Sequence, residues 1–188
     1  TNTDMITVTM ASASTAATNL NTIDLATGTA VNATAITELT GAASDVITAL
    51  GSAGITTVVN NTLAVNVSGT ASVANINTIN ADSATDVVTV GTIGLTAGSF
   101  SLADLGDLAG ITGLTTIDAT NAAKTALTLT FADLFAANDA AVDTNATILV
   151  KLSALDTLSL TTLDGWTAVG VDANGNGNYT HANGVAHT

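Results

Sequence analysis

The residues best suited to chemistry lie near the C-terminus, where oxygen-bearing side chains alternate from Asp172 through Asn174 and Asn176 to Asn178. Ligands at every second position, with glycine at the sixth, match the start of a calcium loop of the EF-hand type. However, the twelfth position carries Asn183 instead of a bidentate Glu, and we expect no helix on either side. A hairpin turn rich in Asn and Gly is therefore the alternative interpretation. Calcium is the one cofactor that the sequence suggests.

A second set of polar residues ends a recurring five-residue signature of the form apolar, Thr or Asn, Thr, apolar, Asp or Asn. Its four copies end at Asp24, Asn80, Asp118 and Asp164. These side chains could form a cation-binding ladder at one corner of a repetitive fold. They could equally cap turns by hydrogen-bonding the backbone, and we favour capping.

Pairs of carboxylates that could act as acid and base occur at Asp104 and Asp107 and at Asp82 and Asp86. Hydrolysis by such a pair needs one raised and one ordinary pKa in a cleft. Neither pair is accompanied in the sequence by His, Arg or an aromatic platform for sugars. The two histidines of the chain lie six residues apart near the C-terminus, with no third fixed metal ligand evident. We therefore expect a protein that is not an enzyme.

Charge restricts the partners of the chain. Its 188 residues include 15 acidic residues against two lysines and no arginine, which gives a net charge of −13. Such a chain repels nucleic acid and anionic membranes, and it attracts cations such as calcium. The chain has no run of about 18 apolar residues, so we expect no membrane insertion. It also lacks cysteine, and its abundance of Thr and Asn is typical of large bacterial surface and secreted proteins.

The elements that would position these residues alternate along the first two thirds of the chain. Apolar residues recur at helical spacing and then switch to the two-residue period of strands. Such alternation with short links favours parallel strands joined by helical crossovers, and each unit needs copies above and below to bury its apolar face. The spacing predicts helices over 44–50, 71–79 and 102–111, and strands over 1–10, 55–67, 86–93 and 114–119.

The character of the sequence changes after residue 121. Strands are expected over 146–152, 157–162, 166–171 and 178–185, joined by turns rich in Asp, Gly and Asn. We expect a mainly β fold: strand-rich, solenoid-like repeats with short helical turns, ending in an antiparallel β unit. The expected domains are a degenerate strand–helix solenoid over residues 1–121 and a β-rich cap or second small domain over residues 122–188.

Several of these segments carry a resemblance to a known class of proteins. They are Leu127–Phe135, Thr147–Val150, Asp156–Leu160, Asp164–Thr167 and Asn178–Gly184, together with Ser44–Leu50 and Val65–Ile76 upstream. The chain resembles modules of large bacterial surface adhesins and surface-layer proteins related to the RTX proteins, which are exported by type I secretion. The resemblance implies a cell-surface or matrix location, adhesion or scaffolding, and frequent dependence on calcium. The glycine-rich calcium nonapeptide of RTX repeats is absent from this sequence, so a calcium-driven roll does not carry over.

The sequence thus predicts a non-enzymatic extracellular structural or adhesive protein, secreted or on the cell surface, as a module of a bacterial surface adhesin or surface layer. The alternative is a self-assembling subunit of an extracellular filament or matrix, with terminal strands completing a neighbour's sheet. A polysaccharide-acting β-solenoid enzyme is a minor alternative. The expected partners are further copies of the chain or neighbouring modules of the same polypeptide, because no Lys or Pro masks the strand edges.

Overall fold

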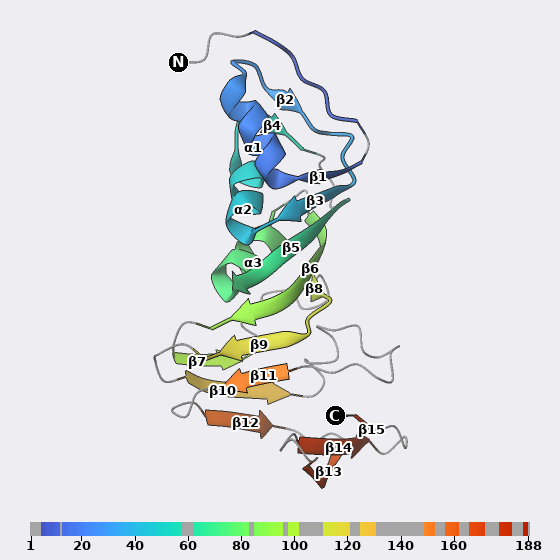
Figure 1. Cartoon of the computed structure of the whole chain (residues 1–188), viewed down its shortest axis with the longest axis vertical. Coiled ribbons are helices and arrows are strands. Elements are labelled where there is room, and N and C mark those ends of the chain that lie inside the picture. The colour runs from blue at the N-terminus through green and yellow to red at the C-terminus, as the bar shows by residue number, and fades with distance from the viewer. Residues whose placement is uncertain are drawn as a thin grey trace. The chain divides into compact units, whose positions relative to one another are not determined.

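The computed structural model describes residues 5–11, 13–57, 62–82, 85–95, 98–101, 111–120, 125–130, 149–152, 157–161, 166–171, 177–181 and 186–187 (Figure 1). The chain divides into two compact units, Thr1–Ile93 and Gly94–Thr188. The domain boundary expected between residues 121 and 122 was based on a change in sequence pattern, from alternating helices and strands to strands joined by polar turns. It stays a prediction.

The expected mainly β solenoid ending in an antiparallel unit is wrong. The fold is mixed α/β, with a mostly parallel sheet of six to seven strands and, within the described residues, three helices. The helices have eight to ten residues each, so they are helical layers of two turns or more and not brief turns between strands. The strand-rich expectation failed because the Thr- and Asn-rich stretch after Ala16 lacks a clear apolar period, yet it is helical in the structure.

In the N-terminal unit each helix directly follows a strand. The strand–helix pairs are β1 (Ser14–Ala16) with α1 (Ala17–Ala26), β3 (Glu38–Gly41) with α2 (Ala43–Gly51), and β5 (Leu63–Ser72) with α3 (Val73–Asn80). The three strands pair in parallel, so that Ser14 lies opposite Glu38 and Glu38 lies opposite Ala64. This confirms, for this unit, the parallel pairing with helical crossovers that the alternation of elements predicts.

A second, shorter ladder runs through the same unit. Strand β2 (Val31–Asn32) pairs in parallel with β4 (Ile55–Thr56). On its other side β2 is bridged by the segment 5–11: the Asn32 N–H donates to the Val8 carbonyl, and the Met10 N–H donates to the Asn32 carbonyl, both at 2.8 Å. Strand β6 (Thr85–Gly94) follows α3.

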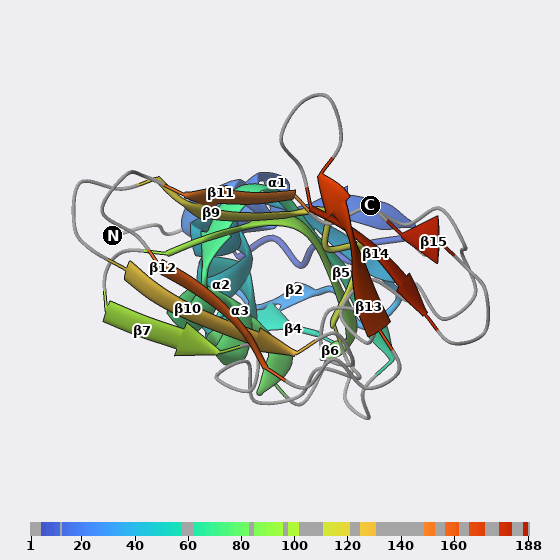
Figure 2. The same ribbon diagram turned by 90° about the horizontal axis from the view of Figure 1, so that it is seen from below.

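The core of the N-terminal unit lies between the helices and these strands and consists of aliphatic side chains. Thr15 is the one buried polar residue among those described. The helices pack in a row, α2 against both α1 and α3, and Figure 2 shows α2 and α3 together on one side of the unit. The buried residues include Leu20 and Ala17 from α1, Val46 and Ala49 from α2, Ile76 and Ile79 from α3, and Leu39, Val65 and Val67 from the strands.

The C-terminal unit holds the remaining strands. Strand β9 (Thr116–Ala119) pairs in parallel with β11 (Leu149–Leu152), and β10 (Thr125–Thr130) pairs in parallel with both β7 (Gly98–Ser101) and β12 (Thr157–Thr161). Strand β8 (Ile111–Thr112) is short. Strands β13 (Trp166–Val171), β14 (Gly177–His181) and β15 (Ala186–His187) form an antiparallel sheet.

The expectation that all four strands after residue 145 form one antiparallel unit is therefore wrong for the first two. Strands β11 and β12 pair in parallel with β9 and β10, which come earlier in the chain. The register of β10 with β12 sets Leu127 opposite Leu158 and Leu129 opposite Leu160. The helix expected over 102–111 lies outside the described residues except at its last position, Ile111, which is in β8.

No helix among the described residues is both long and apolar enough to cross a membrane.

Candidate functional site

The structure places one of the four predicted calcium ligands. Asn178 lies in β14, opposite Gly170 of β13 and next to a β-bulge between Ala168 and Gly170. Asp172, Asn174 and Asn176 lie outside the described residues. Within the described part of the chain, no group of three or more His, Cys, Asp or Glu side chains could hold a metal ion. The calcium site stays a prediction.

The structure describes only one of the two candidate catalytic pairs. Asp104 and Asp107 lie outside the described residues, whereas Asp82 follows α3 and Asp86 lies in β6. The two histidines lie on neighbouring antiparallel strands, His181 opposite Trp166 and His187 opposite Tyr179.

Among the residues that end the recurring signature, Asp24 and Asn80 occupy equivalent positions, each the eighth residue of its helix, and Asp118 does not. Asp24 lies in helix α1 and Asn80 ends helix α3, whereas Asp118 lies in strand β9. Asp164 lies outside the described residues. The two apolar residues of the signature lie three positions apart, which suits a helix. The same spacing also occurs in a Thr-rich strand, so the signature alone does not identify one kind of structural element. The signature therefore marks the same helical position in two copies and a strand in the third.

The most developed polar cluster of the N-terminal unit joins α1 to the turn after α2. The Ser52 hydroxyl donates to Asp24 Oδ2 at 2.7 Å, and the Gly54 N–H donates to Ser52 Oγ at 3.1 Å. Gly54 packs so closely on Asp24 that a Cβ at this position would overlap Asp24 Oδ1. Ser52 uses its hydroxyl both as donor and as acceptor in this cluster, so its hydrogen bonds serve to connect two successive strand–helix units.

Asp118 caps a turn of the C-terminal unit. Its Oδ1 accepts hydrogen bonds from the Thr120 hydroxyl and from the Thr120 N–H, the latter at 3.0 Å. Lys151 Nζ, on the neighbouring strand β11, lies 3.7 Å from Oδ2. The Thr120 hydroxyl, the Thr120 N–H and then the charge of Lys151 hold the pKa of Asp118 below its ordinary value. The capping role favoured for these residues is confirmed for Asp118.

The same local geometry closes a turn in the N-terminal unit. Asn32 Oδ1 accepts from the Thr34 N–H at 3.2 Å and from the Thr34 hydroxyl at 2.7 Å. Short polar side chains that bond the backbone two residues on are a known way to stabilise turns. The abundance of Thr and Asn therefore has a structural use at these positions.

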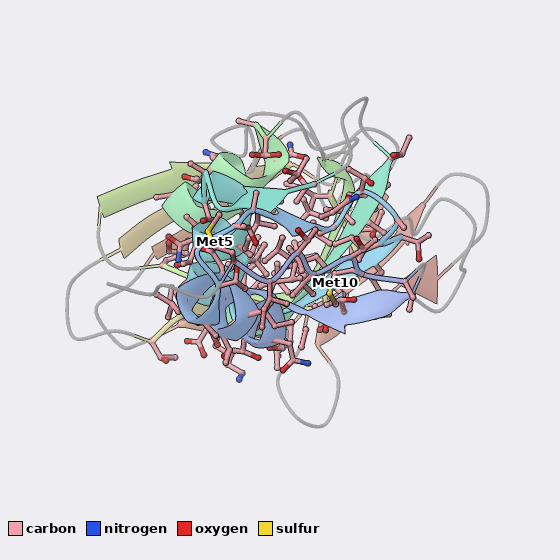
Figure 3. The ribbon with its side chains drawn as sticks, turned by 90° about the horizontal axis from the view of Figure 1, so that it is seen from above. Met5 and Met10 are labelled. Carbon is pink, nitrogen blue, oxygen red and sulfur yellow. The ribbon has the colours of Figure 1, made fainter. Side chains whose placement is uncertain are left out.

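A surface at the first strand–helix unit was missed in the sequence. Of the five large apolar side chains that are exposed among the described residues, three belong to the N-terminal unit: Met5 (79% exposed) and Ile6 (62%) in the segment before β1, and Leu25 (81%) in α1. Figure 3 shows Met5 and Met10 at two ends of the segment that crosses this part of the unit. The signal for it was present in the sequence, because no charged residue occurs from Met5 to Ile23 in a strongly acidic chain.

Comparison of the chain with protein-family models, curated proteins and solved structures finds no match. The resemblance to bacterial adhesin modules stays a prediction from the quoted segments.

Proposed function

We propose that the chain is a non-enzymatic structural module of an extracellular protein, a bacterial surface adhesin or surface-layer protein. The observation that carries the proposal is the stacking of strand–helix units: each adds one parallel strand to the ladder β1–β3–β5 and one helix to the row α1–α2–α3. Units that contact their neighbours in one direction build an extended support. Such a support is the part of an adhesin or surface layer that holds other groups at a distance from the cell.

The way the units are held together also supports this proposal. The interior of the N-terminal unit is aliphatic, and its connections use Ser, Thr and Asn hydroxyl and amide groups in the turns. The Asn21 side-chain amide adds a bond from α1 to the Asp45 carbonyl of α2 at 3.0 Å. The sequence contains no cysteine, so none of these links is a disulfide, and a net charge of −13 favours solubility.

Protease treatment of intact source cells tests the location. Antibodies raised against the purified chain should detect an antigen that is lost when intact cells are treated with a nonspecific protease, while a cytoplasmic marker in the same cells is preserved. An antigen that is digested only after the cells are lysed would contradict the proposal.

Attachment assays test the role. Cells carrying an interrupted gene should bind their surface more weakly or lose their ordered outer layer, and the purified chain added in excess should compete with the attachment of normal cells. Normal attachment and a normal outer layer in the interrupted strain would leave the chain without the proposed role.

A further inference from the structure

The antiparallel sheet of β13, β14 and β15 brings four residues with polar or aromatic rings to one of its faces (Figure 1). His181 of β14 lies opposite Trp166 of β13, and Tyr179 of β14 lies opposite His187 of β15. Residues opposite each other in an antiparallel pair share a face, and so do residues two apart along a strand. Since Tyr179 and His181 are two apart, all four residues occupy one face, which we call the ring face.

The ring face collects residue types that are scarce in the chain. The 188 residues include one Trp, one Tyr and two His. The register therefore places both histidines, the only tryptophan and the only tyrosine on one face of a single three-stranded sheet. A ligand that needs two imidazoles can find them in this chain at this face only.

The positions of the two histidines suit a shared ligand. His187 lies directly opposite Tyr179, and His181 is two residues further along β14, so the two histidines are diagonal neighbours on adjacent strands. Diagonal neighbours are about 7–8 Å apart, with a somewhat shorter separation between their Cβ atoms, and long side chains span this separation. A metal ion with bonds of about 2.0–2.1 Å to nitrogen fits between two imidazoles at such positions.

The donor atoms select the class of metal. Neutral imidazole suits zinc, copper and nickel, whereas calcium and magnesium take oxygen ligands. Within the described strands β13, β14 and β15, no residue is Asp or Glu. The predicted calcium ligand Asn178 falls on the other face of β14, because it is adjacent in sequence to Tyr179. The ring face therefore offers nitrogen ligands, in a chain whose net charge of −13 attracts cations.

We propose that His181 and His187 together bind one divalent transition-metal ion, such as zinc or copper. A four-coordinate ion held by two imidazoles keeps two positions for water or for a group of another molecule. The proposal goes beyond the proposed function, because metal binding by the purified chain does not depend on where the chain is located. The two can therefore fail separately.

Calorimetric titration of the full chain with zinc chloride tests this proposal, on protein purified without a polyhistidine tag. About 0.15 M NaCl and millimolar magnesium in the buffer screen the acidic residues and occupy weak carboxylate sites. We expect one zinc ion per chain. Loss of a residue that only supports a metal ligand costs about 10- to 100-fold in affinity, so His181→Asn and His187→Asn should each weaken zinc binding at least tenfold. Thr180→Ala, on the other face of β14, is the matched control and should leave binding unchanged.

Fluorescence tests the same site without any substitution. Trp166 is the only tryptophan of the chain and lies opposite His181, so its emission reports on the ring face. Copper(II) bound to the two histidines should quench this emission as the first equivalent is added, whereas magnesium at the same concentration should not.

Four results would overturn the proposal. They are no zinc binding by the unaltered chain, binding that both histidine variants retain, a loss that only one of the two variants causes, and copper binding that leaves the emission of Trp166 unchanged. Binding that both variants retain would assign the ion to carboxylates elsewhere in the chain. Circular dichroism spectra establish that the variants keep the fold, and the copper titration decides the matter if they do not.

Discussion

Gly54 is the residue whose replacement the structure constrains most clearly. A Cβ there would overlap Asp24 Oδ1, so Gly54→Ala must turn the carboxylate away and break its bond to Ser52. We expect a loss of about 1–2 kcal/mol in the free energy of unfolding, measured by urea denaturation. Gly51→Ala is the matched control, because a Cβ added at Gly51 would meet no atom within 4 Å and should not destabilise the fold. Equal losses in the two variants would contradict the packing of Gly54 on Asp24.

The pKa of Asp118 predicts how one carboxylate contributes to stability as the pH changes. Hydrogen bonds from Thr120 and the charge of Lys151 lower this pKa in the folded state relative to its ordinary value of about 3.9. A lowered folded pKa gives stability that is present above the unfolded pKa and is lost as the pH falls through the folded pKa. The contribution is small, because Asp118 and Lys151 are partly exposed and the pair is screened by solvent.

Asp118→Asn should therefore lower the melting temperature slightly at pH 7 and have less effect as the pH falls through the lowered folded pKa of Asp118, since the wild-type carboxylate is then protonated too. Thermal unfolding of the two proteins across this pH range measures the difference. Lys151→Gln is a useful companion variant, because it removes the charge but leaves the Thr120 bonds in place. A difference that persists at low pH would mean that the effect of the substitution is not electrostatic.

The two interpretations of Asp172, Asn174, Asn176 and Asn178 predict different responses to calcium. A loop with one carboxylate should bind weakly, with Kd about 1 mM, so roughly 10 mM calcium would stabilise the fold by about 1.4 kcal/mol. Asp172→Asn should abolish that response. A turn that binds no metal would show the same melting temperature with calcium, with chelator and with magnesium at equal ionic strength, and the calcium prediction would then be wrong.

Among the structural elements, the three helices depend on their packing more than on their own sequences. The residues before α1 and α2 are alanines without a side-chain cap, whereas Ser72 Oγ accepts from the Asn75 N–H at the start of α3. Each helix also contains a threonine whose hydroxyl bonds the carbonyl four residues earlier, and threonine is a weaker helix former than alanine. Short helices of this kind are marginal alone, so their buried faces must stabilise them.

Two leucines in α1 test that dependence. Leu20 is fully buried and Leu25 is 81% exposed. Leu20→Ala should lower the free energy of unfolding by about 2–5 kcal/mol, because it leaves a cavity in the core, whereas Leu25→Ala should change it by less than about 0.5 kcal/mol. Denaturant titrations of both variants provide the comparison. A large loss from Leu25→Ala would mean that this exposed side chain also supports the fold, which its exposure does not predict.

The elements also show what could be predicted from sequence. The helices predicted over 44–50 and 71–79 overlap α2 and α3, and Val46, Ile76 and Ile79 are buried as their spacing indicates. The first two residues of the second predicted helix belong to β5 instead. Helix α1 was missed, since it buries Ala17 and Leu20 alone among many polar residues. Alternation fixes the faces of a strand but not its partner, so the parallel pairing of β11 and β12 was not evident. The Asp24 cluster depends on Ser52, 28 residues away, and no local pattern reveals it.

At the scale of the whole molecule, charge has a direct effect on stability. Fifteen acidic residues and two lysines repel one another on average, and compact structure brings them together. The Debye length falls from about 30 Å at 0.01 M salt to about 8 Å at 0.15 M, so added NaCl should raise the melting temperature. We expect a rise of a few degrees, since about 1 kcal/mol moves the midpoint of a domain of this size by roughly 2–4 °C.

An equal rise of the melting temperature in KCl would indicate screening of charge. A rise with only one of the two cations would indicate that this cation binds to the chain. A melting temperature that falls with salt would contradict the prediction. It would mean that attractive pairs such as Asp118 with Lys151 outweigh the repulsion.

The ladder β1–β3–β5 has a consequence for how such a chain can change over generations. Ser14 pairs with a residue 24 positions later, and Glu38 pairs with one 26 positions later, yet both pairs belong to one ladder. Turns between the strands and helices absorb the difference in length. A tandem duplication in the gene that copied one strand and its helix would therefore lengthen the stack without requiring a new interior. Gene duplication could thus change the length of the stack by whole strand–helix units, whereas small insertions would be confined to the turns.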